Sequence, residues 1–166
     1  MKQRILSILV DNTAGVLTRL AGLFSRRGYN IDSITAGVTA NPRFTRITIV
    51  TSGDELVLEQ ITNQVKKQVD VRDVKVLEEN SSVIRELILL KIKVDANQRD
   101  NVLAITNIFR AKIVDVGCDS MIIELTGTQS KLDAFLELLN QYEVLELART
   151  GITALSRGME DVRYFE

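Results

Sequence analysis

Apolar and polar residues alternate between strand-like and helix-like patterns along the first half of the chain. Residues 3–10 carry apolar side chains on both faces, which is typical of an inner strand. Over residues 15–27 the apolar positions recur at steps of three and four, which predicts a helix with one buried face. Residues 29–38 and 44–51 indicate two further strands, joined by a hairpin around the Asn-Pro pair at 41–42.

A second helix and a closing strand complete this half. Residues 52–68 predict a helix that begins at Ser52 or Asp54. Its apolar face carries Val57, Ile61 and Val65. Residues 69–77 favour a strand, but the parity of its apolar residues changes partway along it. We therefore expect a β-bulge or bend at 72–73.

The element order in residues 1–78 is strand, helix, strand, strand, helix, strand, which is that of a ferredoxin-like sandwich. The second half repeats it, with strands predicted at 85–94, 112–117, 119–127 and 143–152, and helices marked by Val102, Ile105 and Phe109 and by Leu132, Leu136 and Leu139. We therefore predict an α+β chain with two ferredoxin-like βαββαβ domains, at 1–78 and 85–158. A linker is expected at 79–84, and a tail at 159–166 that lies along the surface or frays.

The composition narrows the possible functions. The chain has 166 residues, 45% of them hydrophobic, which suffices for one typical core or two small ones. It has no histidine and one cysteine, so Ser-His-Asp and Cys-His nucleophiles, histidine general bases and histidine or zinc sites are excluded. With 21 basic and 22 acidic side chains, the net charge of -1 gives no bulk attraction to nucleic acid or to membranes.

No apolar run approaches the roughly 20 residues that span a bilayer. The start of the chain turns polar too early to hold a signal-peptide core. The single cysteine, Cys118, cannot form an internal disulfide, which fits a reducing compartment. We therefore expect a cytoplasmic protein with no membrane partner.

The turn between the first strand and the first helix, residues 11–15, is the candidate binding site. A helix N-terminus presents free N–H groups and the positive end of a dipole, which favour a carboxylate or phosphate, and Gly15 lets a ligand come close. The amide of Asn12 can donate to a carboxylate and accept from an ammonium, which suits a zwitterion. On the alternative interpretation, Asn12 or Thr13 only caps the helix and Gly15 relieves its first turn.

Asn30 is the second candidate. It follows Gly28, which we expect in the left-handed conformation that ends many helices. We place Asn30 at the start of the second strand, where it would face a partner. Its alternative role is that of an ordinary turn asparagine.

Three classes of function fit a ferredoxin-like sandwich. RNA binding on the open sheet face requires aromatic residues on the central strands, but residues 44–51 offer only Phe44 and residues 3–10 offer none. Acylphosphatase-like hydrolysis requires an arginine in a phosphate-binding loop, and the turn at 11–15 has none. A small-molecule sensor requires only polar turns and glycines at an interface. The residues therefore favour a sensor.

These stretches also resemble a known family. The ACT domain of the regulatory (small) subunit of acetohydroxyacid synthase, also called acetolactate synthase, is similar to ILSILVDNTAGVLTRLAGLFSRRGYNIDSIT, RITIVTSGDE and VLEQITNQVKKQVDVRDV. The C-terminal half of the same subunit resembles RELILLKIKV, IFRAKIVDVG, GTQSKLDAFLELL and ELARTGITALSRG. The resemblance covers nearly the whole chain, with the motifs of both halves in order.

The resemblance implies a regulatory subunit with no catalytic activity of its own, which belongs to a transferase acting on pyruvate in branched-chain amino-acid biosynthesis. Thiamine diphosphate, magnesium and FAD are then expected on the partner large subunit, and no cofactor in this chain. The small subunit would activate the large one and confer feedback inhibition by valine or a related amino acid. It would form a homodimer through its ACT domains, with the effector bound between protomers. The alternative is a freestanding ACT-type amino-acid sensor that acts on another partner.

The resemblance also assigns site residues. The effector segment of the family matches Asn12, Gly15, Val16, Asn30 and Ile31. The N–H groups of Gly15 and Val16 would hold the effector carboxylate, and carbonyls or the Asn30 amide of the facing chain would hold its ammonium. Ile31 and Leu17 would contact its isopropyl group. No catalytic and no metal-binding residue is predicted.

Overall fold

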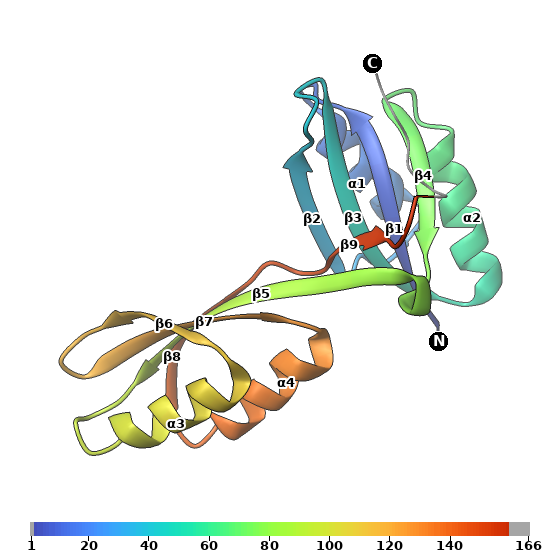
Figure 1. Cartoon of the computed structure of the whole chain (residues 1–166). Coiled ribbons are helices and arrows are strands. Elements are labelled where there is room, and N and C mark those ends of the chain that lie inside the picture. Colours follow the sequence, from blue (N-terminus) through green and yellow to red (C-terminus); the bar gives the residue numbers. More distant parts are fainter. Residues whose placement is uncertain (1, 160–166) are drawn as a thin grey trace. The chain divides into compact units, whose positions relative to one another are not determined.

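The computed structural model describes residues 2–159 (Figure 1). Of the tail predicted at 159–166, only Met159 belongs to this range, and the other residues lie outside it. By their internal contacts the described residues form two compact units. Each unit has a four-strand path in the ferredoxin-like order, so the predicted α+β fold is confirmed.

The first unit follows the predicted order of elements. It contains β1 (Lys2–Asp11), α1 (Val16–Arg26), β2 (Ser33–Val38), β3 (Phe44–Gly53), α2 (Glu55–Lys66) and β4 (Val71–Leu77). The strands are ordered β2-β3-β1-β4 with antiparallel neighbours, and α1 and α2 lie on one face of the sheet (Figure 1). Since β2 begins only at Ser33, Asn30 lies in the loop before the strand, and its predicted place at the strand start is wrong.

β1 pairs with strands on both sides, which explains its continuous apolar run. Alternate residues of β1 face the helices, and the core there comprises Leu6, Ile8, Val10, Val16, Leu20, Leu23, Phe24, Ile47, Ile49, Leu58, Ile61 and Val65. In α2 the buried face is centred on Leu58, Ile61 and Val65. Val57, predicted for that face, is only partly buried because the helix turns Leu58 inward instead.

The predicted irregularity in β4 is confirmed. Leu9 pairs with Asp73, but Val10 pairs with Val71, so Arg72 is an extra residue without a partner in the ladder. This bulge moves the apolar side chains after it to the other parity. It also carries the guanidinium of Arg72 to the carboxylate of Asp11, at the end of β1.

The second unit repeats the architecture. It is built from β5 (Ser82–Lys93), α3 (Arg99–Phe109), β6 (Lys112–Val116), β7 (Ser120–Gly127), α4 (Gln129–Leu138) and β8 (Glu143–Arg149), with the strand order β6-β7-β5-β8. Its core contains Ile88, Leu90, Ile92, Val94, Val102, Met121, Ile123, Leu125, Leu132, Phe135, Leu139 and Tyr142. Within the described range, none of the four helices is long and apolar enough to cross a membrane.

The division of the chain differs from the predicted one at two places. Residues 79–84, expected to be a linker, form the 3-10 helix η1 (Glu79–Ser81) and the start of β5. The strand expected at 143–152 ends at Arg149, and Gly151, whose φ is +83°, turns the chain before a separate strand, β9 (Thr153–Ser156), which pairs with β5. The second unit therefore comprises residues 85–151, and the chain then returns to the first unit.

Candidate functional site

The turn from β1 into α1 leaves the helix N-terminus open. Gly15 is the N-cap residue, in the left-handed region at φ +85°, and no side chain caps the helix. Within residues 2–159, the N–H groups of Val16, Leu17 and Thr18 make no hydrogen bond. The first turn of α1 also has no acidic residue to offset the helix dipole. The interpretation that Asn12 or Thr13 caps this helix is therefore wrong, and the turn is suited to an anionic group.

Asn12 forms hydrogen bonds between the turn and the hairpin that joins β2 to β3. Its Nδ2 donates to the carbonyl of Pro42 at 2.9 Å, and its Oδ1 accepts from the hydroxyl of Thr45 at 3.2 Å. Its backbone N–H donates to the carbonyl of Arg43 at 2.8 Å. Because an amide has two N–H groups and two lone pairs, one of each remains for a ligand. Asn12 thus positions the turn and can still bind a polar group.

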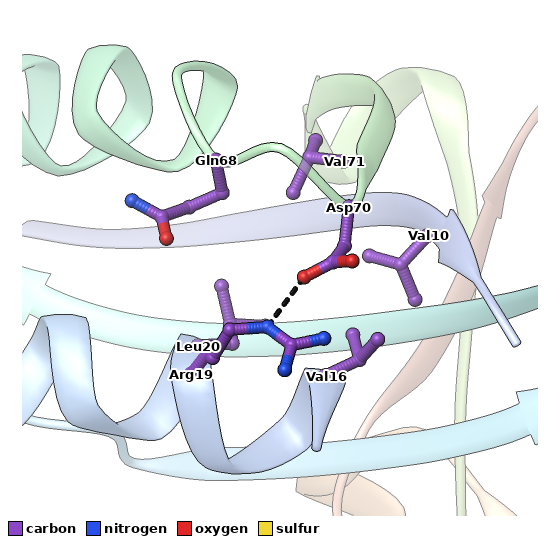
Figure 2. Close-up of a pocket in the computed structure, with 7 residues that line it drawn as sticks. All are labelled: Val10, Val16, Arg19, Leu20, Gln68, Asp70 and Val71. Carbon is purple, nitrogen blue, oxygen red and sulfur yellow. Dashed lines mark hydrogen bonds and ion pairs between the residues drawn. The ribbon is translucent and has the colours of Figure 1, made fainter. Parts of the chain in front are cut away.

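Arg19 lies over the turn, which sequence reasoning missed. Its Nε donates to Oδ2 of Asp70 at 2.6 Å (Figure 2). Its Nη2 donates to the carbonyl of Ala14 at 3.5 Å. A Cβ added to Gly15 would come within 2.8 Å of Nη1 of Arg19. The spacing of four residues places Arg19 on the same helix face as Gly15, which is the one signal in the sequence that could have found it.

A shallow pocket opens beside this arginine. It lies between α1 and the loop from α2 to β4, and its walls are Val10, Val16, Arg19, Leu20, Gln68, Asp70 and Val71 (Figure 2). The apolar walls come from the core, whereas Arg19 and Asp70 form an ion pair at the pocket.

The predicted site residues form two separate groups in one chain. Asn12, Gly15, Val16 and Leu17 lie together at the start of α1, where Val16 is buried and Leu17 is 49% exposed. Asn30 and Ile31 follow the end of α1, and a helix of 11 residues is about 16 Å long. The two groups therefore do not meet within a single first unit.

Asn30 is part of a polar cluster at its own end of the sheet. Its Nδ2 donates to Oδ1 of Asp32 at 2.5 Å, and its carbonyl accepts from the hydroxyl of Thr51 at 2.6 Å. Asp32 also accepts a hydrogen bond from Ser52. Ile31 packs against the core and is partly buried. The carboxylate of Asp32 was not predicted, although an acidic residue two positions after Asn30 is the natural partner of an ammonium.

Arg72 forms an ion pair with Asp11, the acidic residue at the start of the turn. Its guanidinium donates from both Nε and Nη2 to the carboxylate of Asp11, with the Nε–Oδ1 distance at 2.7 Å. This hydrogen bonding holds the pKa of Asp11 below its ordinary value of 3.8, and the pKa of Arg72 is raised in turn. Asp11 is therefore a paired anion, and its charge is already neutralised where the turn begins.

The edge strand β2 offers an open side. It pairs with β3 on one side, and its other edge has no strand partner within the described residues. Ile34 and Val38 on this strand are exposed. Exposed edge strands are templates for pairing with another chain. β2 is thus the element through which a second copy could extend this sheet.

Two family models together match most of the chain. Residues 6–73 match a model described as the AHAS small subunit-like ACT domain, and residues 85–158 match one described as the small subunit of acetolactate synthase. Similar proteins carry the same description. The probable acetolactate synthase small subunit of Methanothermobacter thermautotrophicus is 50% identical over 93% of this chain and 92% of its own length. The acetolactate synthase isozyme 3 small subunit of Escherichia coli is 46% identical over 97% of this chain and 99% of its own.

A solved structure agrees with these matches. The crystal structure of the acetolactate synthase small subunit from Thermotoga maritima superposes with a TM-score of 0.90 at 40% identity. The superposition covers 96% of this chain and 99% of that one. Sequence and fold thus point to the same group of proteins over both units.

Proposed function

This chain belongs to the family of acetolactate synthase small subunits, and on that premise we propose that it activates a catalytic large subunit and makes it sensitive to a branched-chain amino acid. Membership of this family implies the large-subunit partner. In this proposal the small subunit performs no catalysis. Thiamine diphosphate, magnesium and FAD belong to the large subunit, a transferase acting on pyruvate, and the complex works in the cytoplasm. Valine is the first candidate for the effector.

The observation that supports effector binding most strongly is the left-handed Gly15 at the N-terminus of α1. Unpaired N–H groups at Val16 and Leu17 follow the left-handed Gly15 and would donate to the carboxylate of the effector. Such charge-assisted hydrogen bonds are stronger than neutral ones. The guanidinium of Arg19 lies next to the same turn, where Asp70 balances its charge.

The ammonium group of the effector would be held by the other cluster. Asn30 and Asp32 supply an amide and a carboxylate at the far end of α1. A two-fold axis beside β2 and perpendicular to the sheet reverses the direction of α1 in the second protomer. The start of one α1 then lies near the end of its partner, and the two separated groups of site residues come together. This argument requires the homodimer, which would form through the open edges of β2.

The apolar side chain of the effector would contact Leu17 and Ile31. Leu17 is half-exposed at the start of α1, and Ile31 is partly buried after its end. These contacts would favour valine, leucine or isoleucine over small polar amino acids, because burying each methylene contributes about 0.8 kcal/mol. Discrimination among the three would depend on the space left between the protomers.

Two experiments test the proposal. The chain is co-expressed with an acetolactate synthase large subunit, and the acetolactate-forming activity of the complex is titrated with valine. The free chain is titrated calorimetrically with valine, leucine, isoleucine and, as a control, D-valine. We expect co-purification, activation of the large subunit and stereospecific binding of at least one of the three L-amino acids. Failure to co-purify would favour the freestanding sensor, and no heat with any of the three would contradict the sensing role.

A further inference from the structure

The open face of the first sheet is covered by the last part of the described chain. Residues 152–157, here called the crossing segment, return from the second unit and belong to the first (Figure 1). Within it, Ile152 is 7% exposed and Ala154 is 4% exposed. They form a small core with Ile5, Val50, Leu77 and Ile84. The face away from the helices therefore has a cover of its own.

Two hydroxyls of β2 hold the start of this segment. The N–H of Ile152 donates to Oγ of Ser33 at 2.8 Å, and the carbonyl of Ile152 accepts from Oγ1 of Thr35 at 2.8 Å. Side chains two positions apart in a strand lie on the same face, which is why both can reach one residue. We call this pair of hydrogen bonds the hydroxyl clasp. At the other end, the N–H of Arg157 donates to the carbonyl of Ser81 at 2.8 Å.

Two of the residues joined by the hydroxyl clasp directly follow the proposed ammonium site and the second unit in the sequence. Ser33 comes directly after Asp32 and the Asn30 cluster, to which the proposed function assigns the effector ammonium. Ile152 comes directly after Gly151, the last residue of the second unit. Gly151 has a φ of +83°, which glycine adopts readily, so the chain can change direction there at little cost. The clasp therefore connects β2 to the first residue of the chain after the second unit.

We propose that the hydroxyl clasp is the coupling between effector binding and the second unit. This inference rests on the proposed function, because it takes valine as the effector and the loop before β2 as part of its site. When valine binds, it fixes the loop 30–32 and the start of β2, which strengthens the hold of Ser33 and Thr35 on Ile152. The crossing segment is then held more tightly against the first sheet, and so is the start of the chain that follows Gly151. Without the hydroxyls, valine binds but its effect does not reach the second unit.

The test removes the two hydroxyls. The double variant Ser33→Ala/Thr35→Val keeps the strand and loses both hydrogen bonds, whereas Thr39→Val removes a hydroxyl that bonds the carbonyl of Asn41 within the hairpin. All proteins are assayed as the full chain in complex with the large subunit. Three quantities are measured: the calorimetric Kd for valine, the residual activity at saturating valine, and the hydrogen exchange of residues 152–157 with and without valine.

In the double variant we expect the Kd for valine to rise by less than about tenfold, because one or two neutral hydrogen bonds are lost and linkage passes part of that loss to the ligand. The maximal inhibition is expected to fall by at least about half. In wild type and in Thr39→Val, valine should slow the exchange of residues 152–157, and in the double variant it should not. The single variant Thr35→Ser keeps a hydroxyl and should behave as wild type.

Each other outcome counts against the proposal. If the double variant is inhibited as fully as wild type, the clasp does not couple the units. If it binds no valine at all, the hydroxyls belong to the effector site instead. Should the double variant fail to fold, the single variants Ser33→Ala and Thr35→Val take its place, with intermediate loss of inhibition expected and full inhibition contradicting the clasp. Absence of valine binding in wild type would overturn the proposed function itself, which is a separate result.

Discussion

The two units share one order of elements but differ at the turn from their first strand into their first helix. In the first unit this turn ends in Gly15, and no side chain caps α1. In the second unit the carboxylate of Asp95 accepts from the N–H groups of Asn97 and Gln98 at 2.8 and 2.9 Å. The side chain of Gln98 reaches back to the N–H of Asp95 at 3.0 Å. Neither α1 nor α3 has a side-chain cap, but the turn before α1 ends in a left-handed glycine, whereas the turn before α3 is closed by the hydrogen bonds of Asp95 and Gln98.

The arginines next to the two turns also differ in their contacts. In the second unit Arg99 donates to the carbonyls of Gly117 and Cys118, so its guanidinium holds a hairpin in place. In the first unit Arg19 lies over the turn and pairs with Asp70 at the pocket. The comparison teaches that a repeated fold does not carry a repeated site. We therefore propose an effector site in the first unit alone, and a structural role for the corresponding turn of the second.

The substitution with the largest expected effect fills the open turn. Gly15→Asp places a carboxylate where the effector carboxylate would bind, and a Cβ there already meets Arg19. We expect valine affinity to fall by more than about 100-fold and feedback inhibition to be lost, because two anions compete for the same N–H groups. Activation of the large subunit should persist. Calorimetry and activity assays of the complex give both answers.

Gly15→Asn is the matched control for this variant. It adds nearly the same volume without the charge, and asparagine tolerates a positive φ. We expect it to weaken valine binding less than Gly15→Asp does. If both variants remained fully sensitive to valine, the assignment of the site to this turn would be wrong.

The next largest effect concerns the stability of the second unit. Arg149 donates to both oxygens of Glu86, at 2.7 and 2.9 Å, and Glu86 is only 6% exposed. Arg149→Met leaves that carboxylate buried without its partner, which we expect to cost about 2–3 kcal/mol of unfolding free energy. The control Lys91→Met breaks the exposed pair with Glu146 and should change little. Denaturant unfolding of both variants measures the difference, and equal stability would contradict the structural role of Glu86.

A smaller effect tests the two turns directly. Asp95→Ala removes the acceptor of two backbone N–H groups and should destabilise the second unit by about 1 kcal/mol. Thr13→Ala, in the open turn, removes no cap and should stay within about 0.5 kcal/mol of wild type. Neither substitution should change the Kd for valine by more than about twofold. A larger loss of stability for Thr13→Ala than for Asp95→Ala would reverse the contrast between the turns.

The smallest expected effect is the change in the pKa of Asp11 when Arg72 is replaced. Arg72 lowers the pKa of Asp11, so the pair contributes to stability above the ordinary carboxyl value of 3.8 and loses that contribution as pH falls through the folded-state pKa. In Arg72→Met the pKa of Asp11 should rise toward 3.8. A pH titration of the Asp11 carboxyl by NMR measures this shift. An unchanged pKa would show that the bidentate pair does not form in solution.

Much of the fold follows from local patterns in the sequence. The parity change in residues 69–77 correctly predicted the bulge at Arg72, and Gly28 has the expected positive φ after α1. These features are set by neighbouring residues. The crossing segment could not be predicted in this way, because the sequence pattern of residues 143–152 favours one strand, whereas β8 ends at Arg149 and Gly151 has a positive φ.

Only part of the candidate site was predicted, because some of its contacts join residues that are distant in the sequence. The turn and helix-end patterns singled out Asn12, Gly15 and Asn30, which the family resemblance also matched. The roles of Arg19 and Asp32 depend on contacts with Asp70 and Ser52, which are distant in the sequence. The choice between a capped and an open turn depended on the backbone angle of Gly15. Composition and periodicity do not determine that angle.

The most direct test of the shared site uses hybrid dimers. Chains carrying Gly15→Asp are co-expressed with differently tagged chains carrying Asn30→Ala, and the hybrid is purified through both tags. Neither homodimer retains an intact site, but in the hybrid one site combines Gly15 of one chain with Asn30 of the other. The account predicts about one valine bound per hybrid dimer, half the wild-type value, by calorimetry. No valine binding by the hybrid, with wild type binding normally, would contradict a site built from two chains.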